Sequence, residues 1–277
     1  MTTPTIATSI PRRDNDRAAN RERLRSMLRS ILLPLLGVLI IFGVWWLSII
    51  GFQIEKFLLP SPADVWNAFM MNPQFIMLQT WVTLAETLQG FILAIVLAVP
   101  LATVIASSKI IEQMIYPLLL AINAAPKVAI APLLVVWMGF GQEPKVVMVV
   151  LLCFFPIILA TTTGLRSTPS EFIELAKSLG SNSVQTFLKF RAPFALEQVF
   201  VGLKTAISLA VIGAVIAEFV GANQGLGYLI VQSGASANTS LAFVAIVLLA
   251  FISMALFYLL VLIEKLLIPW AESQRAK

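Results

Sequence analysis

Long apolar runs, separated by short polar connections, occupy most of this chain. Several of them exceed the roughly 20 residues that an α-helix needs to cross about 30 Å of hydrocarbon. We expect membrane-spanning helices at about 30–52, 81–106, 113–138, 145–165, 197–220 and 239–263. The pattern therefore predicts an all-α polytopic membrane protein in which residues 30–270 form one transmembrane domain.

Polar residues gather outside the runs in three places: an arginine-rich tail at 1–29, a long charged loop at 166–196 and a short tail at 271–277. On the other side, the connections hold only Lys56 and Lys145 as basic residues. Basic segments stay on the cytoplasmic face of a membrane. Both termini and the 166–196 loop are therefore predicted to be cytoplasmic.

Prolines punctuate several of these segments. Leu59-Pro60-Ser61-Pro62 lies in the stretch 52–80, which we interpret as an external loop that forms either a re-entrant turn or a lid. Three more, Pro117, Pro126 and Pro132, fall in the third run, so we expect this helix to bend or break. Broken helices at membrane depth are tolerated where they line a cavity.

Small residues recur at every fourth position in the second and fifth runs: Gly90, Ala94, Ala98, Ala102 and Ala106 in one, and Ala206, Ala210 and Ala214 in the other. A ridge of small side chains lets another helix backbone approach closely. We therefore predict that these two runs are inner helices. The bulkier first and sixth runs are predicted to face lipid.

Composition narrows the chemistry further. Apolar residues make up 59% of the chain and charged residues 12%, mean hydropathy is +0.92, histidine is absent, and Cys153 is the single cysteine. With no histidine and no close carboxylate pair inside a run, the sequence lacks the parts of a metal site or a membrane enzyme. The net charge of +5 comes from tails and connections, which does not favour a nucleic-acid partner.

Residues 168–180 in the charged loop carry the start and stop signals of a short helix. Thr168 is the expected N-cap, Pro169 takes the first helical position, Glu171 completes a capping box and Gly180 supplies the left-handed end. One face of this helix is apolar: Phe172, Leu175, Ala176 and Leu179. Three partners are open for that face, namely the lipid surface, the protein's own helices and a groove on another subunit.

The segment Glu174-Leu175-Ala176-Lys177-Ser178-Leu179-Gly180 resembles the coupling loop of ATP-binding-cassette (ABC) importer permeases. That family's pattern is Glu-Ala-Ala, three residues, Gly, nine residues and Ile-x-Leu-Pro. The positions that keep the pattern are Glu174, Ala176, Gly180 and Pro193. The positions that depart from it by an apolar exchange are Leu175, Phe190 and Ala192.

Further motifs are similar to those of the nitrate/sulfonate/taurine-type branch of these permeases. The third run holds Pro126-Lys127-Val128-Ala129-Ile130-Ala131-Pro132-Leu133 and then Trp137-Met138-Gly139-Phe140-Gly141. Leu59-Pro60-Ser61-Pro62, Ala217-Glu218 and Gly225-Leu226-Gly227 also fit that branch. The resemblance runs through residues 30–270 and leaves the arginine-rich tail outside it.

The resemblance implies a non-enzymatic type I importer permease, located in the bacterial inner membrane, that moves a small solute. It implies that the capped helix docks on ABC ATPase subunits through seven residues: Glu174, Ala176, Gly180, Phe172, Leu175, Leu179 and Pro193. The ATPase would hold ATP and Mg²⁺. We expect no cofactor on this chain, which has no phosphate-loop motif. An external solute-binding protein and a second permease copy complete the implied assembly.

Polar and aromatic residues within or beside the runs are candidates for the translocation pathway: Lys127, Asn123, Glu86, Glu218, Trp137 and Asn223. Lys127 either faces the pathway, which favours an anionic or carbonyl-bearing solute, or binds carbonyls freed by the break at Pro126. Glu86 and Glu218 either pair across helices or gate the outer vestibule. The other three serve either as solute contacts or as interhelical and interfacial anchors.

Other functions compete with import. An ATP-independent solute or ion channel suits a broken third run but has no need of a capped cytoplasmic helix. An exporter would use the same complex in the opposite direction. Permeases of this appearance serve sulfonates, taurine and nitrate as well as heterocycles such as pyrimidine vitamin precursors and riboflavin, so the sequence leaves the solute open.

Overall fold

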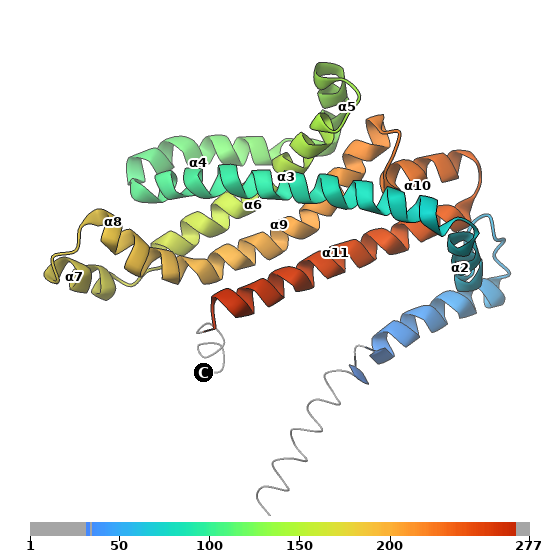
Figure 1. Ribbon diagram of the computed structural model, residues 1–277, viewed down its shortest axis with the longest axis horizontal. Helices are drawn as coiled ribbons and strands as arrows, with labels where there is room; N and C mark the ends of the chain where they lie inside the picture. Colours follow the sequence, from blue (N-terminus) through green and yellow to red (C-terminus); the bar gives the residue numbers. More distant parts are fainter. Residues whose placement is uncertain (1–31, 34, 270–277) are drawn as a thin grey trace, which may run out of the picture. The chain divides into compact units, whose positions relative to one another are not determined.

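The computed structural model describes residues 32–33 and 35–269, and every regular element among them is helical (Figure 1). The predicted tails at 1–29 and 271–277 lie outside the described residues. The described chain divides into two compact units, 32–63 and 64–269. In the first unit, the apolar helix Leu35–Phe52 corresponds to the first predicted span, and none of this 18-residue window is buried.

The rest of the chain supplies the remaining helices. Their bounds are α2 Pro62–Met71, α3 Pro73–Ser107, α4 Lys109–Ala124, α5 Lys127–Met138, α6 Glu143–Arg166, α7 Ser170–Ser178, α8 Ser183–Thr186, the π-helical segment η1 Phe187–Arg191, α9 Ala192–Gly221, α10 Leu226–Ala235 and α11 Thr239–Leu267. Five helical stretches of the described chain are long and apolar enough to cross a membrane, and the bent α4–α5 pair makes a sixth. The prediction of about six spans is confirmed.

Three helices, α3, α6 and α9, form the core of the second unit and pack along one another (Figure 1). The predicted small-residue ridges lie in these contacts, since Ala94, Ala98 and Ala102 of α3 have no exposed surface. A Cβ atom at Gly90 would lie 2.4 Å from the Cβ of Val149 in α6, which is closer than packed atoms come. The small residues therefore permit backbone approach, and α3 and α9 are inner helices as expected.

The third predicted span is not one helix. A break at Ala125 and Pro126 separates α4 from α5, and the two helices meet at an angle of 89°. Pro126 cannot donate the backbone hydrogen bond that would continue the helix. Pro117 and Pro132 lie inside helices that continue through them, and so do Pro100 in α3 and Pro156 in α6.

The interpretation of 52–80 as a loop was wrong for most of its length. Helix α2 occupies Pro62–Met71, and α3 begins at Pro73, about two turns before the expected start of the second span. Asn72 caps α3 by accepting a hydrogen bond from the Phe75 amide at 3.3 Å. Prolines at the first turn of each helix fit there because the first-turn amides have no intrahelical partner.

The charged loop at 166–196 forms α7, α8 and η1, and from Ser183 onward it joins α9 in one helical stretch that ends at Gly221. Helix α9 itself begins at Ala192, five residues before the predicted start of the fifth span at 197. Asn182 and Gln185 form a capping box at the start of this stretch. The Ala192 amide donates to the carbonyl of Phe187, five residues earlier, so a π-helical turn leads into Pro193.

Helix α7 differs from its predicted form at its start. It begins at Ser170 with Pro169 in the capping position, and Thr168 is buried without capping the helix. Gly180 ends the helix at φ +71° as predicted, with its amide donating to the carbonyl of Lys177. On the predicted apolar face, Ala176 alone is fully buried.

Candidate functional site

Helix α3 carries a polar stripe on the face that continues as its small-residue ridge. Gln79, Thr83, Glu86 and Thr87 are all at least 97% buried. Their spacing of three and four residues places them on one side of the helix. The buried face of α3 is thus polar in its first half and small and apolar in its second.

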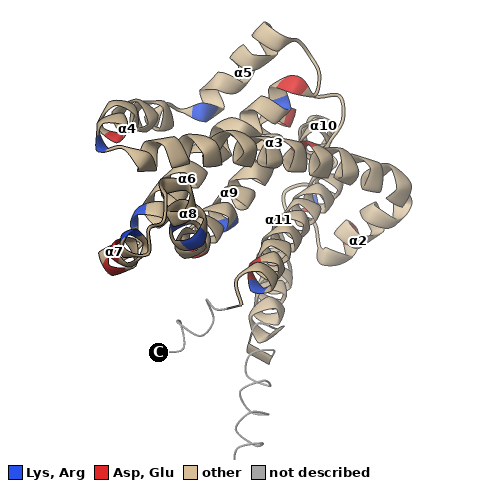
Figure 2. Cartoon of the chain, turned by 60° about the vertical axis from the view of Figure 1, so that its left-hand side comes forward, with Lys and Arg blue, Asp and Glu red and all other residues tan. Residues whose placement is uncertain are grey.

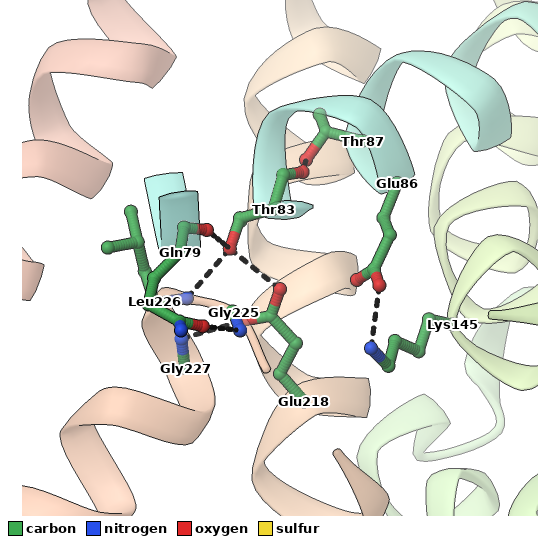
Figure 3. Close-up of polar contacts among 9 residues, drawn as sticks. All are labelled: Gln79, Thr83, Glu86, Thr87, Lys145, Glu218, Gly225, Leu226 and Gly227. Atoms are coloured by element: carbon green, nitrogen blue, oxygen red, sulfur yellow. Dashed lines mark hydrogen bonds and ion pairs between the residues drawn. The ribbon is translucent and has the colours of Figure 1, made fainter. Parts of the chain in front are cut away.

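Glu218, near the end of α9, binds to this stripe and to the start of α10 (Figure 3). The Thr83 hydroxyl donates to Glu218 Oε1 at 2.7 Å, and the Gly227 amide donates to Glu218 Oε2 at 2.5 Å. The same Thr83 oxygen accepts from the Leu226 amide at 2.8 Å, and Gln79 Oε1 accepts from the Gly225 amide at 2.6 Å. Amides at a helix start favour an acidic partner, so an internal side chain fills this anion-binding position.

The glycine at 225 is required by this arrangement. Gly225 has φ +113° and ψ 165°, a conformation that is essentially restricted to glycine. A Cβ atom there would lie 2.3 Å from the carboxyl carbon of Glu218. Gly225-Leu226-Gly227 is therefore the backbone cradle of Glu218.

A second acidic residue, Glu86, pairs with Lys145 at the start of α6 (Figure 3). Lys145 Nζ lies 2.6 Å from Glu86 Oε1, and the two residues are 7% and 2% exposed. The other carboxyl oxygen of Glu86 has no hydrogen-bond partner among the described residues. Lys145, which we expected in an outer connection, is therefore a buried structural cation.

A pocket of about 570 Å³ opens beside this ion pair, and we call it the Trp81 pocket. Its lining includes Trp81 and Glu86 of α3, Phe140 and Lys145 around the start of α6, and Asn223 and Gln224 between α9 and α10. The pocket combines two aromatic rings, amide side chains and an ion pair whose charges cancel. Such a lining suits a planar solute with hydrogen-bonding groups.

The structure brings together some of the predicted pathway residues and separates others. Glu86 and Asn223 line the Trp81 pocket, and Glu218 lies behind it in the α3–α10 network. Glu86 takes Lys145 of α6 as its partner and Glu218 takes Thr83 of α3. Both carboxyl groups are thus held by contacts between helices, and a gating role for them stays a prediction.

Lys127 and Asn123 lie together at the break in the third span. Lys127 Nζ donates to the Asn123 side-chain oxygen at 2.6 Å and to its backbone carbonyl at 3.3 Å. The ammonium thus binds a carbonyl at the end of α4, as one of the two predicted roles requires. Neither residue lines the Trp81 pocket, and nor does Trp137, which is 70% exposed on α5.

The predicted coupling residues lie at the other end of the core helices. Helix α6 begins near the Trp81 pocket at Glu143 and ends at Arg166, directly before α7. On α7, Phe172, Leu175 and Leu179 are between 41% and 70% exposed. The ring of Phe172 contacts Phe194 of α9 at 5.0 Å between centroids.

Sequence reasoning missed Gln79, Thr83 and Lys145, which complete the buried polar network. A signal was present for the first two, because they precede Glu86 at helical spacing within an apolar run. For Lys145 there was no such signal in the sequence. Lys145 follows the connection Gly139-Phe140-Gly141, where a lysine is expected to be an exposed loop residue.

Together, the apolar helical bundle, the broken third span and the polar pocket define a polytopic membrane permease. Comparison with known proteins gives its family. Residues 90–272 match the model of the binding-protein-dependent transport system inner membrane component, and the chain belongs to that family. The predicted resemblance to ABC importer permeases is confirmed, and the protein is a multi-pass permease subunit of the inner membrane.

The relatives of this chain are named for the transport of different solutes. The chain is 38% identical to the riboflavin transport system permease of Chloroflexus aurantiacus, over 91% of this chain and 96% of the relative. It is 34% identical to the formylaminopyrimidine transport permease of Halalkalibacterium halodurans, over 87% and 96%. It is 27% identical to the taurine transport system permease of Escherichia coli, over 87% and 90%.

The fold is also similar to a solved structure. The chain matches a subunit of the MetNI methionine ABC transporter in an inward-facing conformation with a TM-score of 0.60. The match covers 71% of this chain and 96% of that one, at 19% sequence identity. This likeness supports the fold class that the sequence predicted.

Proposed function

We propose that this importer permease is driven through α7, which docks on a separate ABC ATPase that binds ATP and Mg²⁺. The observation that carries the proposal is the placement of α7. The helix exposes Phe172, Leu175 and Leu179 to an outside partner, while its buried Ala176 and the Phe172–Phe194 contact fix it to the bundle. A rigidly mounted apolar face is suited to a groove on another subunit.

The connection between α7 and the pocket supports a mechanical role. The stretch 183–221 is helical throughout, and Gly221 at its end lines the Trp81 pocket. Movement of the loop by an ATPase would therefore reach the pocket through α9. In this arrangement α7 and both chain termini are cytoplasmic, and the Trp81 pocket opens toward the external binding protein.

Two substitutions, one on α7 and one directly after it, test this coupling. Glu174→Arg and Gly180→Val are each expected to abolish ATPase co-purification and solute uptake, while membrane insertion persists. Glu174 is exposed, so its replacement disturbs the partner's groove and not the bundle. At Gly180, φ +71° is strained for valine, so the end of the helix is displaced. The measurement is affinity co-purification of the ATPase together with uptake in whole cells.

A matched control is Glu143→Arg, which makes the same charge change on an exposed residue. Glu143 is the first residue of α6, whereas α7 follows the last residue of that helix. It should retain ATPase co-purification. If Glu174→Arg and Gly180→Val both retained the ATPase as well, the docking role of α7 would be refuted.

We further infer that two copies of the permease form the complex with two ATPases and one external binding protein. Each chain carries one α7, so two-fold symmetry gives each ATPase one docking helix. Helix α5 and the connection that follows it offer an apolar surface for the second copy. Its most exposed residues outside the Trp81 pocket are Val136 and Trp137, each at least 70% exposed.

For the solute, we infer a hydrogen-bonding heterocycle in preference to a sulfonate. Lys145, the cation of the Trp81 pocket, is already neutralised by Glu86, so a free anion finds no unpaired charge there. Trp81 and Phe140 provide aromatic surfaces that suit a planar ring. Two relatives at 38% and 34% identity are named for riboflavin and formylaminopyrimidine transport, which supports this preference.

Uptake by the complete transporter, with riboflavin and taurine as probes, tests the solute class. Riboflavin should be taken up and taurine should not. Trp81→Ala should lower that uptake about fivefold to tenfold because one aromatic contact is lost. Trp66→Ala on α2 removes an equally exposed indole outside the pocket and should leave uptake unchanged. Taurine uptake, or full activity of Trp81→Ala, would contradict the assignment.

A further inference from the structure

A second cavity, of about 340 Å³, lies at the α7 end of the bundle, and we call it the basic pocket. It is formed where α3 ends, α4 begins, α6 ends and η1 precedes α9. Figure 2 shows Lys and Arg around α7, α8 and the first turn of α4. This pocket shares none of its lining residues with the Trp81 pocket.

The charge of the basic pocket is positive. Its lining contains Lys109, Arg166 and Arg191 and no acidic residue. Arg166 is engaged, since it pairs with Glu112 and donates to the Ile105 carbonyl at 3.2 Å. Lys109 is exposed, and the Nε atom of Arg191 is buried without a hydrogen-bond partner in the described part of the chain. Two cations are therefore left to bind an anion.

Thr168 provides an independent indication of a ligand. It lines the basic pocket and is 7% exposed, yet its hydroxyl has no hydrogen-bond partner among residues 35–269. A buried hydroxyl without a partner costs free energy. Together with Arg191 Nε, the Thr168 hydroxyl gives two unused donors in a pocket that Lys109 also lines. Phosphate oxygens accept hydrogen bonds from such donors.

The surface next to the pocket is apolar. Helix α4 begins at Lys109 and presents four residues at a spacing of four, each between 60% and 69% exposed: Ile110, Met114, Leu118 and Ile122. The stripe starts at the basic pocket and runs along the span. Its length and polarity match the acyl chain of a lipid, whereas a free phosphate ion has no use for it.

We propose that the basic pocket binds the phosphate of an anionic phospholipid whose acyl chain lies along the α4 stripe. Lys109, Arg191 and the Thr168 hydroxyl hold the headgroup. Basic pockets between spans on the cytoplasmic side are suited to such headgroups. The cytoplasmic location rests on the proposed orientation of α7, but lipid binding itself does not depend on that orientation.

Native mass spectrometry of the purified permease with its ATPase tests the proposal. The probes are phosphatidylglycerol and phosphatidylcholine with identical acyl chains. The wild-type complex should retain phosphatidylglycerol preferentially. The double variant Lys109→Gln/Arg191→Gln should lose about 25-fold in that preference, since each basic residue near an anionic headgroup contributes about fivefold. Lys189→Gln, an exposed cation of η1 outside the pocket, should change nothing.

Thr168→Val separates binding from folding. Because the Thr168 hydroxyl has no hydrogen-bond partner among the residues that the structure describes, its removal should leave the melting temperature of the delipidated complex unchanged or raised. The same variant should bind phosphatidylglycerol more weakly. A lower melting temperature with unchanged lipid binding would assign Thr168 a purely structural role and overturn its part in the site.

Two further outcomes would overturn the proposal. If inorganic phosphate displaced phosphatidylglycerol at equal concentration, the pocket would be a site for a free anion. If Lys109→Gln/Arg191→Gln lost the ATPase and not the lipid, the pocket would belong to the subunit interface. Failure of α7 docking would leave the lipid preference of the isolated permease intact, so the two proposals fail separately.

Discussion

Gly225→Ala is expected to destabilise the permease by about 3 kcal/mol or more and to remove most of it from the membrane. The new Cβ atom would lie 2.3 Å from the Glu218 carboxyl group. Glu218 must then leave the Thr83 hydroxyl, which keeps only the more distant Gln79 carbonyl as an acceptor at 3.3 Å, and the Gly227 amide, which loses its carboxylate partner. The cost combines backbone strain of about 1–3 kcal/mol with an overpacking term of similar size.

Gly139→Ala is a matched control for this variant. Gly139 has φ +82° and ψ −176°, close to the backbone conformation of Gly225, but no atom lies within 4 Å of the place that an added Cβ atom would take. Gly139→Ala therefore introduces the backbone strain of an alanine at positive φ without the collision between its Cβ atom and a neighbouring side chain. Thermal melting of the purified permease in detergent measures both variants. Equal losses for Gly139→Ala and Gly225→Ala would show that the Glu218 cradle contributes nothing.

Lys145→Met is expected to destabilise the permease by about 3–5 kcal/mol. The change keeps the length of the side chain but leaves the Glu86 carboxyl group 2% exposed and without its cation. Breaking a buried pair is costly because the remaining charge has neither water nor a partner. The melting temperature and the yield of folded protein should both fall.

The double variant Lys145→Met/Glu86→Leu tests whether the unpaired charge of Glu86 causes the loss of stability in Lys145→Met. Replacing a buried pair by apolar residues of similar size is often neutral, so the double variant should recover most of the stability lost in Lys145→Met. It would still lack the polar surface of the Trp81 pocket, and its uptake should stay low. Stability that remained low in the double variant would mean that the loss arises from packing and not from the stranded charge.

The inner face of the bundle could be predicted from the sequence because it depends on local periodicity. Ala94, Ala98 and Ala102 recur at helical spacing, and their burial follows from that spacing alone. A break in the third run was predictable from its three prolines, but its position was not, because helices continue through Pro117 and Pro132. The left-handed end at Gly180 was predictable because glycine adopts positive φ readily. These features need no knowledge of which helix lies opposite.

The polar network could be predicted only in part. Glu86 and Glu218 stood out as acids in apolar runs, but their partners depend on how distant segments align. Lys145 lies 59 positions from Glu86, and Thr83 lies 135 positions from Glu218. No local pattern fixes the register between such segments, because it is decided by the packing of α3 against α6 and α9.

Two short helices escaped prediction for a different reason, whereas the nine-residue α7 was predicted from its start and stop signals. Helices α2 and α10 have ten residues each, which is too short to span a membrane and too short for periodicity to distinguish them from loops. The start of helix α10, at Gly225-Leu226-Gly227, is stabilised by the hydrogen bond between the Gly227 amide and the Glu218 side chain. Tertiary contacts, and not intrinsic propensity, define these elements.

The continuous helical stretch from Ser183 to Gly221 determines how large a movement it can transmit from one end to the other. Its 39 residues span roughly 58 Å at the rise of an α-helix. Treated as a lever pivoting at one end, it would convert a tilt of about 5° into a sweep of roughly 5 Å at the other. The π-helical turn at Phe187–Arg191 interrupts the regular α-helical hydrogen bonding near one end of this lever. In the proposed mechanism, the stiffness of this turn would set how much of the ATPase's movement reaches the Trp81 pocket.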